Sequence, residues 1–255
     1  MHRFYVPPDQ SQGEMFSLPE REAHHASSVL RVRSGELVTV LDGTGTALRC
    51  RVETVRKKHV DVAVIERVRN DPPPFSITLL QALPKGKIIE SIIQKATELG
   101  VQRIVPLITE RVATRLDDDA SETKAGKWQH VAVEAIKQCG APWLPKVEPP
   151  VTPIEFIRRA EKFDLPLIAS LQPGSRHPRE YFDGFMARHH HRPKSVCVWI
   201  GPEGDLTPEE VRIIEEAGAR PITLGQLVLR VETAAVYCLS ILNYELGAPG
   251  TEPGA

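Results

Sequence analysis

Two hydrophobic periodicities follow one another along the 255-residue chain. Within the first seventy residues, apolar and polar side chains alternate, which is the pattern of strands with one buried face. The alternating segments are Glu36–Gly43, Ala47–Val55 and His59–Val68, and turn-like pieces such as Gly43–Thr46 separate them. A helix is expected just before them, at Glu20–Arg31. This part of the chain therefore predicts a small antiparallel sheet or barrel.

A proline-rich linker ends this region at Asp71–Pro74. Three consecutive prolines continue neither a strand nor a helix, so we place the domain boundary there. We expect one domain over residues 1–71 and a second over residues 75–247. The last residues, 248–255, are expected to be a disordered tail because they are rich in glycine and proline.

After the linker, short apolar runs alternate with segments whose apolar residues recur at helical spacing. Strands are predicted at Ser76–Leu83, Arg103–Thr109, Leu165–Leu171, Ser195–Gly201 and Pro221–Gly225. Helices are predicted at Lys87–Val101, Lys127–Gly140, Thr207–Gly218 and Glu232–Leu246. Alternation of this kind predicts an α/β domain with a mostly parallel sheet covered by helices on both faces.

Composition narrows the function classes only slightly. The net charge is -1, so any polyanion partner would need a local basic patch. The four cysteines form no C-x-x-C pair, and Cys197 and Cys238 lie in apolar runs, which is typical of buried thiols in a reducing compartment. The N-terminus lacks the apolar stretch of a signal peptide, and no run is as long as a membrane span. We therefore expect a soluble cytoplasmic protein.

Several common catalytic motifs are absent from the sequence. The lysines at Lys85 and Lys87 lack the spacing of a nucleotide P-loop, and no G-x-G-x-x-G follows a strand. No serine-hydrolase elbow or H-E-x-x-H pair occurs. His189–His191 is expected to be a solvated loop, because adjacent histidines rarely complete a tetrahedral shell. No metal site is predicted.

Two loops near the C-terminus interrupt apolar runs with glycines and charges. The first is GPEGD at Gly201–Asp205, and the second is LGQLVLRVETAA at Leu224–Ala235. Taken singly, the first can be a tight strand-to-helix turn, and Leu227, Val228 and Leu229 can be core residues. Arg230 and Glu232 can form a surface pair, or Arg230 can contact an anionic or planar substrate.

Five segments in a fixed order carry a resemblance to a known family: Leu83–Val101, Glu110–Leu116, Lys127–Val147, Ile200–Glu210 and Leu224–Ala235. With Arg3–Val6 and Glu22–Glu36, they resemble the bacterial 16S ribosomal RNA uridine-N3 methyltransferases, which belong to the knotted SPOUT class. The resemblance implies a trefoil-knotted C-terminal domain after a PUA-like N-terminal β-barrel. Asp205 departs from the family, which usually has glycine there, and Gln226 and Leu227 also depart. Asp205 would either place charge near the cofactor or cap the following helix.

The resemblance also implies a cofactor, S-adenosyl-L-methionine, held where three loops meet. The cofactor-binding residues would be Leu171, Ile200, Gly201, Glu203, Gly204, Leu224, Gly225, Val228 and Leu229. Arg230 would stabilise the charge that develops on the uracil, and Glu232 would orient Arg230 or take part in proton removal. The alternative for this pair is a salt bridge that closes the knot.

The expected partners are 16S ribosomal RNA or the small ribosomal subunit, and a second copy of the chain. RNA-binding residues implied by the resemblance and by local charge are Arg3, His25, Arg31, Arg49, Arg51, Lys57 and Lys58. The last helix would contribute to a homodimer. Two alternatives stay open at this point: an RNA methyltransferase of the same fold with another target, and a non-catalytic RNA-binding ribosome-assembly factor.

Overall fold

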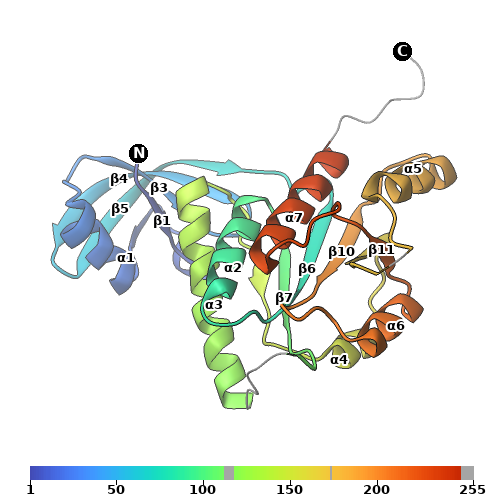
Figure 1. Ribbon diagram of the computed structural model, residues 1–255. Helices are drawn as coiled ribbons and strands as arrows, with labels where there is room; N and C mark the ends of the chain where they lie inside the picture. Colours follow the sequence, from blue (N-terminus) through green and yellow to red (C-terminus); the bar gives the residue numbers. More distant parts are fainter. Residues whose placement is uncertain (112–117, 173, 248–255) are drawn as a thin grey trace. The chain divides into compact units, whose positions relative to one another are not determined.

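The computed structural model describes residues 1–111, 118–172 and 174–247 (Figure 1). These residues form two compact units. The first unit comprises Met1–Pro72 together with Val133–Leu144, and the second comprises Pro73–Ala132 together with the chain from Pro145 onward. The expected tail, 248–255, and residues 112–116 of one family-like segment lie outside the described residues.

The first unit is built on a five-stranded sheet with the order β1-β3-β4-β5-β2. Its strands are β1 (Arg3–Tyr5), β2 (Met15–Ser17), β3 (Leu37–Leu41), β4 (Thr46–Arg56) and β5 (His59–Arg69). The three strands predicted from alternation are confirmed, and their buried positions form one core that includes Leu48, Cys50 and Val52. Neighbouring strands are antiparallel except β1 and β3, which are parallel.

The predicted helix at Glu20–Arg31 is present but changes type along its length. It begins as α1 (Glu20–His24) and continues as a π-helical turn, η2 (His25–Leu30). Arg31 ends it in the left-handed region at φ 54°, which is uncommon for a residue other than glycine. A short 3-10 turn, η1 (Pro8–Gln10), lies upstream. Hydrophobic spacing located this helix, but it does not distinguish a π-helical turn from an α-helical one.

The segment Val133–Leu144 packs with the first unit through specific contacts. The ammonium of Lys137 lies 2.8 Å from the Glu22 carboxylate, and both side chains are only 6% exposed. Arg3 donates to the backbone carbonyls of Lys137 and Gln138 at the end of α3 (Asp118–Cys139). The expected domain limits had placed all of this segment in the second domain. A buried lysine paired with a carboxylate over 100 residues away is not visible in local sequence.

The second unit contains a parallel six-stranded sheet with the order β11-β9-β10-β6-β7-β8. Its strands are β6 (Ser76–Ala82), β7 (Arg103–Leu107), β8 (Lys146–Val147), β9 (Leu165–Ala169), β10 (Ser195–Ile200) and β11 (Arg220–Ile222). Each pair of neighbouring strands in this sheet is parallel, so the α/β prediction is confirmed. The trefoil knot stays a prediction.

Helices cover both faces of this sheet (Figure 1). They are the first part of α3 with α2 (Ile88–Glu98), α4 (Pro153–Arg158), α5 (Pro178–His189), α6 (Pro208–Glu216) and α7 (Val231–Gly247). α4 and α6 pack on one face, where Phe156 and Ile214 join Trp199 in a buried cluster. α2 and α7 lie beside one another on the other face. The sequence did not predict α4, which is only six residues long, or α5, in which only Pro178 and Phe182 are buried.

Histidines 189–191 lie at the end of α5 and just beyond it, where all three are exposed. The His189 ring stacks on Phe185 with 4.3 Å between centroids. The described residues contain no group of three or more His, Cys, Asp or Glu side chains placed to hold a metal ion. Within the same residues, no helix combines the length and apolar character needed to cross a membrane.

Three of the four cysteines are buried, and Cys139 is exposed. Burial raises the pKa of Cys50 to about 11 and that of Cys197 and Cys238 to about 12, so these thiols stay protonated near neutral pH.

We therefore expect a thiol-specific disulfide reagent at pH 8 to modify one cysteine, Cys139, rapidly in the folded protein and all four cysteines in denaturant. Cys139→Ser should abolish the rapid phase, and a rapid phase that survived this substitution would contradict the burial assignment.

Candidate functional site

Three loops meet at one edge of the parallel sheet because three adjacent strands end there. β9 pairs with both β10 and β11 in parallel, so the carboxyl ends of all three point the same way. The residues that follow them are Ser170–Gln172, Gly201–Thr207 and Thr223–Arg230. Open α/β sheets bind ligands in crevices outside the carboxyl ends of their strands. The topology therefore places the glycine-containing loops where a ligand site is expected.

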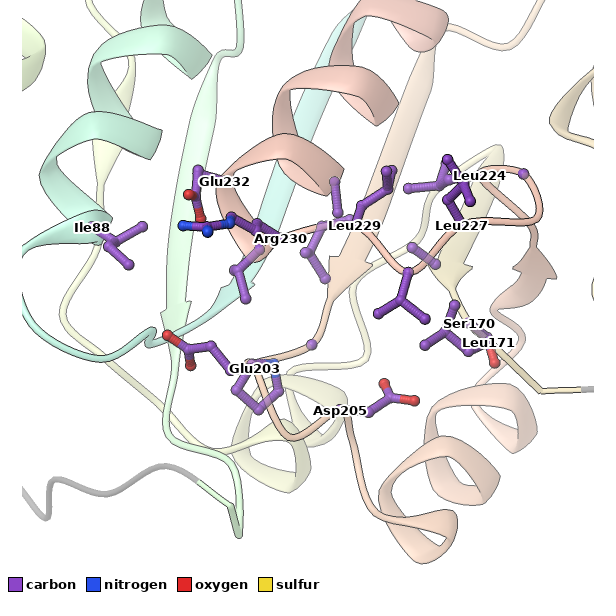
Figure 2. A pocket seen from close by; sticks show the side chains of 18 residues that line it. Ile88, Ser170, Leu171, Glu203, Asp205, Leu224, Leu227, Leu229, Arg230 and Glu232 are labelled. Carbon is purple, nitrogen blue, oxygen red and sulfur yellow. The ribbon is translucent and has the colours of Figure 1, made fainter.

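A cavity of about 440 Å³ lies between these loops (Figure 2). This volume is within the usual range of small-molecule sites. Its walls are formed by Ile88, Ala169, Ser170, Leu171, Ile200, Gly201, Pro202, Glu203, Asp205, Leu224, Gly225, Leu227, Val228, Leu229, Arg230, Val231, Glu232 and Ala234. The lining is mostly apolar, with three carboxylates and one guanidinium among the charged groups.

Backbone geometry at Gly201 explains why glycine stands at the end of β10. A Cβ atom there would lie 3.1 Å from Asp205 Oδ1 and 3.2 Å from the backbone nitrogen of Leu206. Both contacts are tighter than ordinary packing, so a side chain would displace the loop that forms the cavity wall. The absence of Cβ also lets a ligand approach the backbone closely at this point.

Thr207, and not Asp205, caps the helix that follows. The Thr207 hydroxyl accepts a hydrogen bond from the Glu210 backbone N–H, and the Glu210 carboxylate accepts one from the Thr207 N–H. This capping box confirms the predicted start of the helix. Asp205 instead adopts a left-handed conformation at φ 61° and lines the cavity. The prediction that Asp205 caps the helix is therefore wrong, and a role for its charge near the cofactor stays a prediction.

Contacts from two neighbouring loops hold Gly201–Thr207 in place. Arg111 donates to the Gly204 carbonyl at 2.5 Å, and the Glu110 N–H donates to the buried Glu210 carboxylate. On the other side, the Lys85 N–H donates to Glu203 Oε1 at 2.9 Å. These contacts connect the loop to the segments after β7 and before α2. No local pattern predicted the last contact, because it joins residues 118 positions apart.

The loop between β11 and α7 presents its apolar side chains outward. Leu227 is 76% exposed and Val228 is 81% exposed, so the reading of these residues as core is wrong. Arg230 immediately precedes α7, and Glu232 lies in its first turn. Within the described part of the chain, Arg230 and Glu232 form no ion pair within 4.0 Å, and the structure therefore gives no support to a knot-closing salt bridge. Both side chains face the cavity (Figure 2).

The cavity brings together most of the residues singled out in the sequence. It contains Arg230 and Glu232 and eight expected cofactor contacts: Leu171, Ile200, Gly201, Glu203, Leu224, Gly225, Val228 and Leu229. The exception is Gly204, which packs against the Arg111 side chain instead. Sequence reasoning missed Ile88, which reaches the cavity from the first turn of α2. An isoleucine in a helical pattern carries no signal that separates a ligand contact from a core position.

The expected RNA-binding residues of the first unit do not form one cluster but lie on different elements. Lys57 and Lys58 form the tip of the β4–β5 hairpin, which contacts η2 because Ser27 donates to the Lys57 carbonyl. Arg31 ends η2 and is exposed, while His25 is half-buried with its ring edge-on to Phe4.

Four of the expected RNA-binding residues are engaged by protein groups: Lys58, whose ammonium lies 2.7 Å from the Glu20 carboxylate, and Arg3, Arg49 and Arg51. Arg49 lies 4.0 Å from Glu66, and Arg51 lies 2.8 Å from Glu53. Arg3 donates to the end of α3. Exposed ion pairs are weak, so Arg49 and Arg51 can exchange their partners for a phosphate. Arg3 already has a structural role.

Comparison with known proteins gives two matching family models. The description "RNA methyltransferase domain" applies to residues 71–243, and "RNA methyltransferase PUA domain" applies to residues 18–65. Ribosomal RNA small subunit methyltransferase E of Bacillus subtilis is 30% identical over 96% of this chain and 97% of its own length. The Aquifex aeolicus protein of the same name is also 30% identical, over 95% of this chain and 99% of its own.

Two similar solved structures contain S-adenosylmethionine. A methyltransferase from Legionella pneumophila, in complex with this cofactor, is 34% identical with a TM-score of 0.85, covering 94% of this chain and 96% of that one. Ribosomal RNA small subunit methyltransferase E from Neisseria gonorrhoeae, also bound to it, is 30% identical with a TM-score of 0.83, covering 96% and 97% of the two chains.

Proposed function

Because the chain belongs to the ribosomal RNA small subunit methyltransferase E family of RNA methyltransferases, we propose that it methylates N3 of a specific uridine in 16S ribosomal RNA, with S-adenosylmethionine as donor. The observation that carries the proposal is the cavity between three loops, with an arginine at its wall and leucines around it. RNA methyl transfer follows from the family, whereas the atom and the base are the proposed part.

The lining of the cavity fits this cofactor. Leu224, Leu227 and Leu229 supply apolar surface for a planar base, and Gly201 permits a ligand to contact the backbone. Glu203, Asp205 and Glu232 can accept hydrogen bonds from ligand hydroxyl or ammonium groups. When bound, S-adenosylmethionine supplies a methyl group activated by its sulfonium. The protein contributes position and electrostatics.

Arg230 is the proposed catalytic residue. Uracil N3 carries a proton that must leave before or during methyl transfer, and the negative charge that this loss creates is shared with the flanking carbonyl oxygens until the N3–carbon bond forms. A guanidinium is always charged and presents several donors in a fixed plane, so Arg230 can stabilise that charge. No described carboxylate is within ion-pairing distance of Arg230, which leaves its donors available to the substrate. The target base must be unpaired, since N3 lies on its pairing edge.

Glu232 is proposed to orient Arg230. It lies in the first turn of α7, where the helix dipole favours a carboxylate, and it is half-buried. An anion stabilised in this way is better suited to positioning a guanidinium than to removing a proton. In Figure 2 the two side chains occupy the same end of the cavity.

The first unit is proposed to hold the RNA. Lys57, Lys58 and Arg31 would contact phosphates around the hairpin tip, with Arg49 and Arg51 on the neighbouring strand and His25 beside Phe4. Phosphate contacts position the RNA but do not read its sequence. We further propose a homodimer through α7, on which Tyr237 and Tyr244 are exposed, and a cytoplasmic location, where ribosomal RNA is found.

A direct test uses purified protein, S-adenosylmethionine with a labelled methyl group, and small ribosomal subunits or 16S RNA from a strain lacking the homologous gene. We expect label in the RNA and 3-methyluridine in its nucleoside digest by mass spectrometry. Another methylated nucleoside would favour a different target, and no transfer despite RNA binding would favour a non-catalytic assembly factor.

Arg230→Ala and Gly201→Val should separate the two halves of the reaction. Arg230→Ala should keep cofactor affinity and reduce transfer by about 100-fold or more, the usual effect of losing one charge-stabilising donor. Gly201→Val should abolish cofactor binding, measured by calorimetry, while hydrogen exchange shows that the first unit stays folded. Normal turnover by Arg230→Ala would remove this residue from the mechanism, and normal affinity in Gly201→Val would place the cofactor elsewhere.

Lys57→Glu should weaken RNA binding without changing cofactor affinity. The residue is exposed at the hairpin tip, and its loss should lower the affinity for 16S RNA and reduce the salt-dependence slope by about one. Lys162→Glu is the matched control because Lys162 is also an exposed lysine but belongs to the second unit, outside the cavity. Equal effects of the two substitutions would mean that only overall charge matters.

A further inference from the structure

The cavity has two chemically different ends (Figure 2). Arg230, Glu232 and Glu203 lie at one end. Leu224, Leu227, Leu171 and Ser170 lie toward the other, and of the three lining carboxylates Asp205 is the one on that side. A cofactor with a planar base and a charged reactive part would therefore place its base among the leucines. Asp205 would then face the nucleoside part of the ligand.

The backbone holds Asp205 in an uncommon conformation. Its φ of 61° lies in the left-handed region, which aspartate tolerates better than most residues but less well than glycine. Its N–H donates to the Pro202 carbonyl at 2.9 Å, which closes the turn. The turn therefore fixes the position of the Asp205 Cα atom and the direction of its side chain.

One carboxylate oxygen of Asp205 is engaged by the protein, and the other is not. Oδ1 accepts a hydrogen bond from the Leu206 N–H at 2.8 Å and lies 3.1 Å from the Cβ position of Gly201. The carboxylate thus folds over the glycine that forms the cavity wall. Among residues 1–111, 118–172 and 174–247, no side chain or backbone donor reaches Oδ2, and no cation pairs with Asp205.

We propose that the Asp205 carboxylate accepts hydrogen bonds from the ribose hydroxyls of the cofactor, which makes it a specificity-determining residue for the nucleoside. A carboxylate only accepts, so a ligand that covers it must bring donors or leave it desolvated at considerable cost. A vicinal diol offers two donors spaced for one carboxylate, next to the base that the leucines cover. This inference rests on the proposed function, because it assumes that the cofactor occupies this cavity.

The test measures binding of S-adenosylhomocysteine, which cannot react, by calorimetry. Asp205→Asn keeps an acceptor for the Leu206 N–H and tolerates the left-handed backbone, while it removes the charge. We expect its dissociation constant to rise about tenfold or more, as for the loss of a charged hydrogen bond. The melting temperature without ligand should not fall. Asp205→Gly, which relaxes the backbone, should show the same loss of affinity. Glu209→Gln, on the exposed surface of α6, is the control with the same change in net charge.

A second ligand identifies the group that Asp205 meets. For S-adenosylhomocysteine lacking both ribose hydroxyls, wild type and Asp205→Asn should bind equally. A tenfold difference that persisted would overturn the ribose assignment in favour of an amine contact, and unchanged affinity of both Asp205 variants for the intact ligand would overturn the inference alone. If wild type bound neither ligand, the proposed function would fall with it.

Discussion

Parallel pairing of β9 with β10 and β11 is the constraint on which the site depends. Since adjacent parallel strands end at the same edge, residues from three distant parts of the chain meet there. The cavity wall is mostly loop, and loops alone hold their positions poorly. Ile200 and Ala169 are the last residues of β10 and β9, so the rigid sheet fixes the positions at which the following loops begin.

Hydrogen bonds then fix the central loop along its length. The capping box of Thr207 and Glu210 secures one end, Arg111 holds the Gly204 carbonyl, and Glu203 is tied to the Lys85 backbone. Asp205 closes a turn within the same few residues. A loop held at this many points keeps its glycine backbone in a binding geometry before any ligand arrives, so binding need not supply the energy to order it.

The sequence predicted most of the strands and helices because their signals are local. Alternating residues located β4 and β5, helical spacing located α2 and α6, and Thr207 with Pro208 marked a helix start that the structure confirms. The resemblance named loop residues that the structure gathers in one cavity, although their roles stay predictions.

The features that were missed depend on tertiary contacts. Ile88 reaches the cavity from a helix with no distinguishing pattern, and Leu227 is exposed although its neighbours in sequence are apolar. Nothing in the sequence of η2 distinguishes a π-helical turn from an α-helical one.

The discontinuous composition of the first unit has a consequence for synthesis of the chain. The buried partner of Glu22 is the Lys137 ammonium, and a Cβ at Gly45 would lie 2.4 Å from the Trp143 ring; both partners belong to the segment Val133–Leu144, which follows the linker only after most of α3. As the polypeptide leaves the ribosome, the amino-terminal sheet therefore emerges with one unpaired carboxylate and an uncovered hairpin turn. Its completion must wait for the end of α3, so maturation is ordered in time: Pro73–Ala132 of the second unit is translated before the first unit is closed, and the rest of the second unit follows.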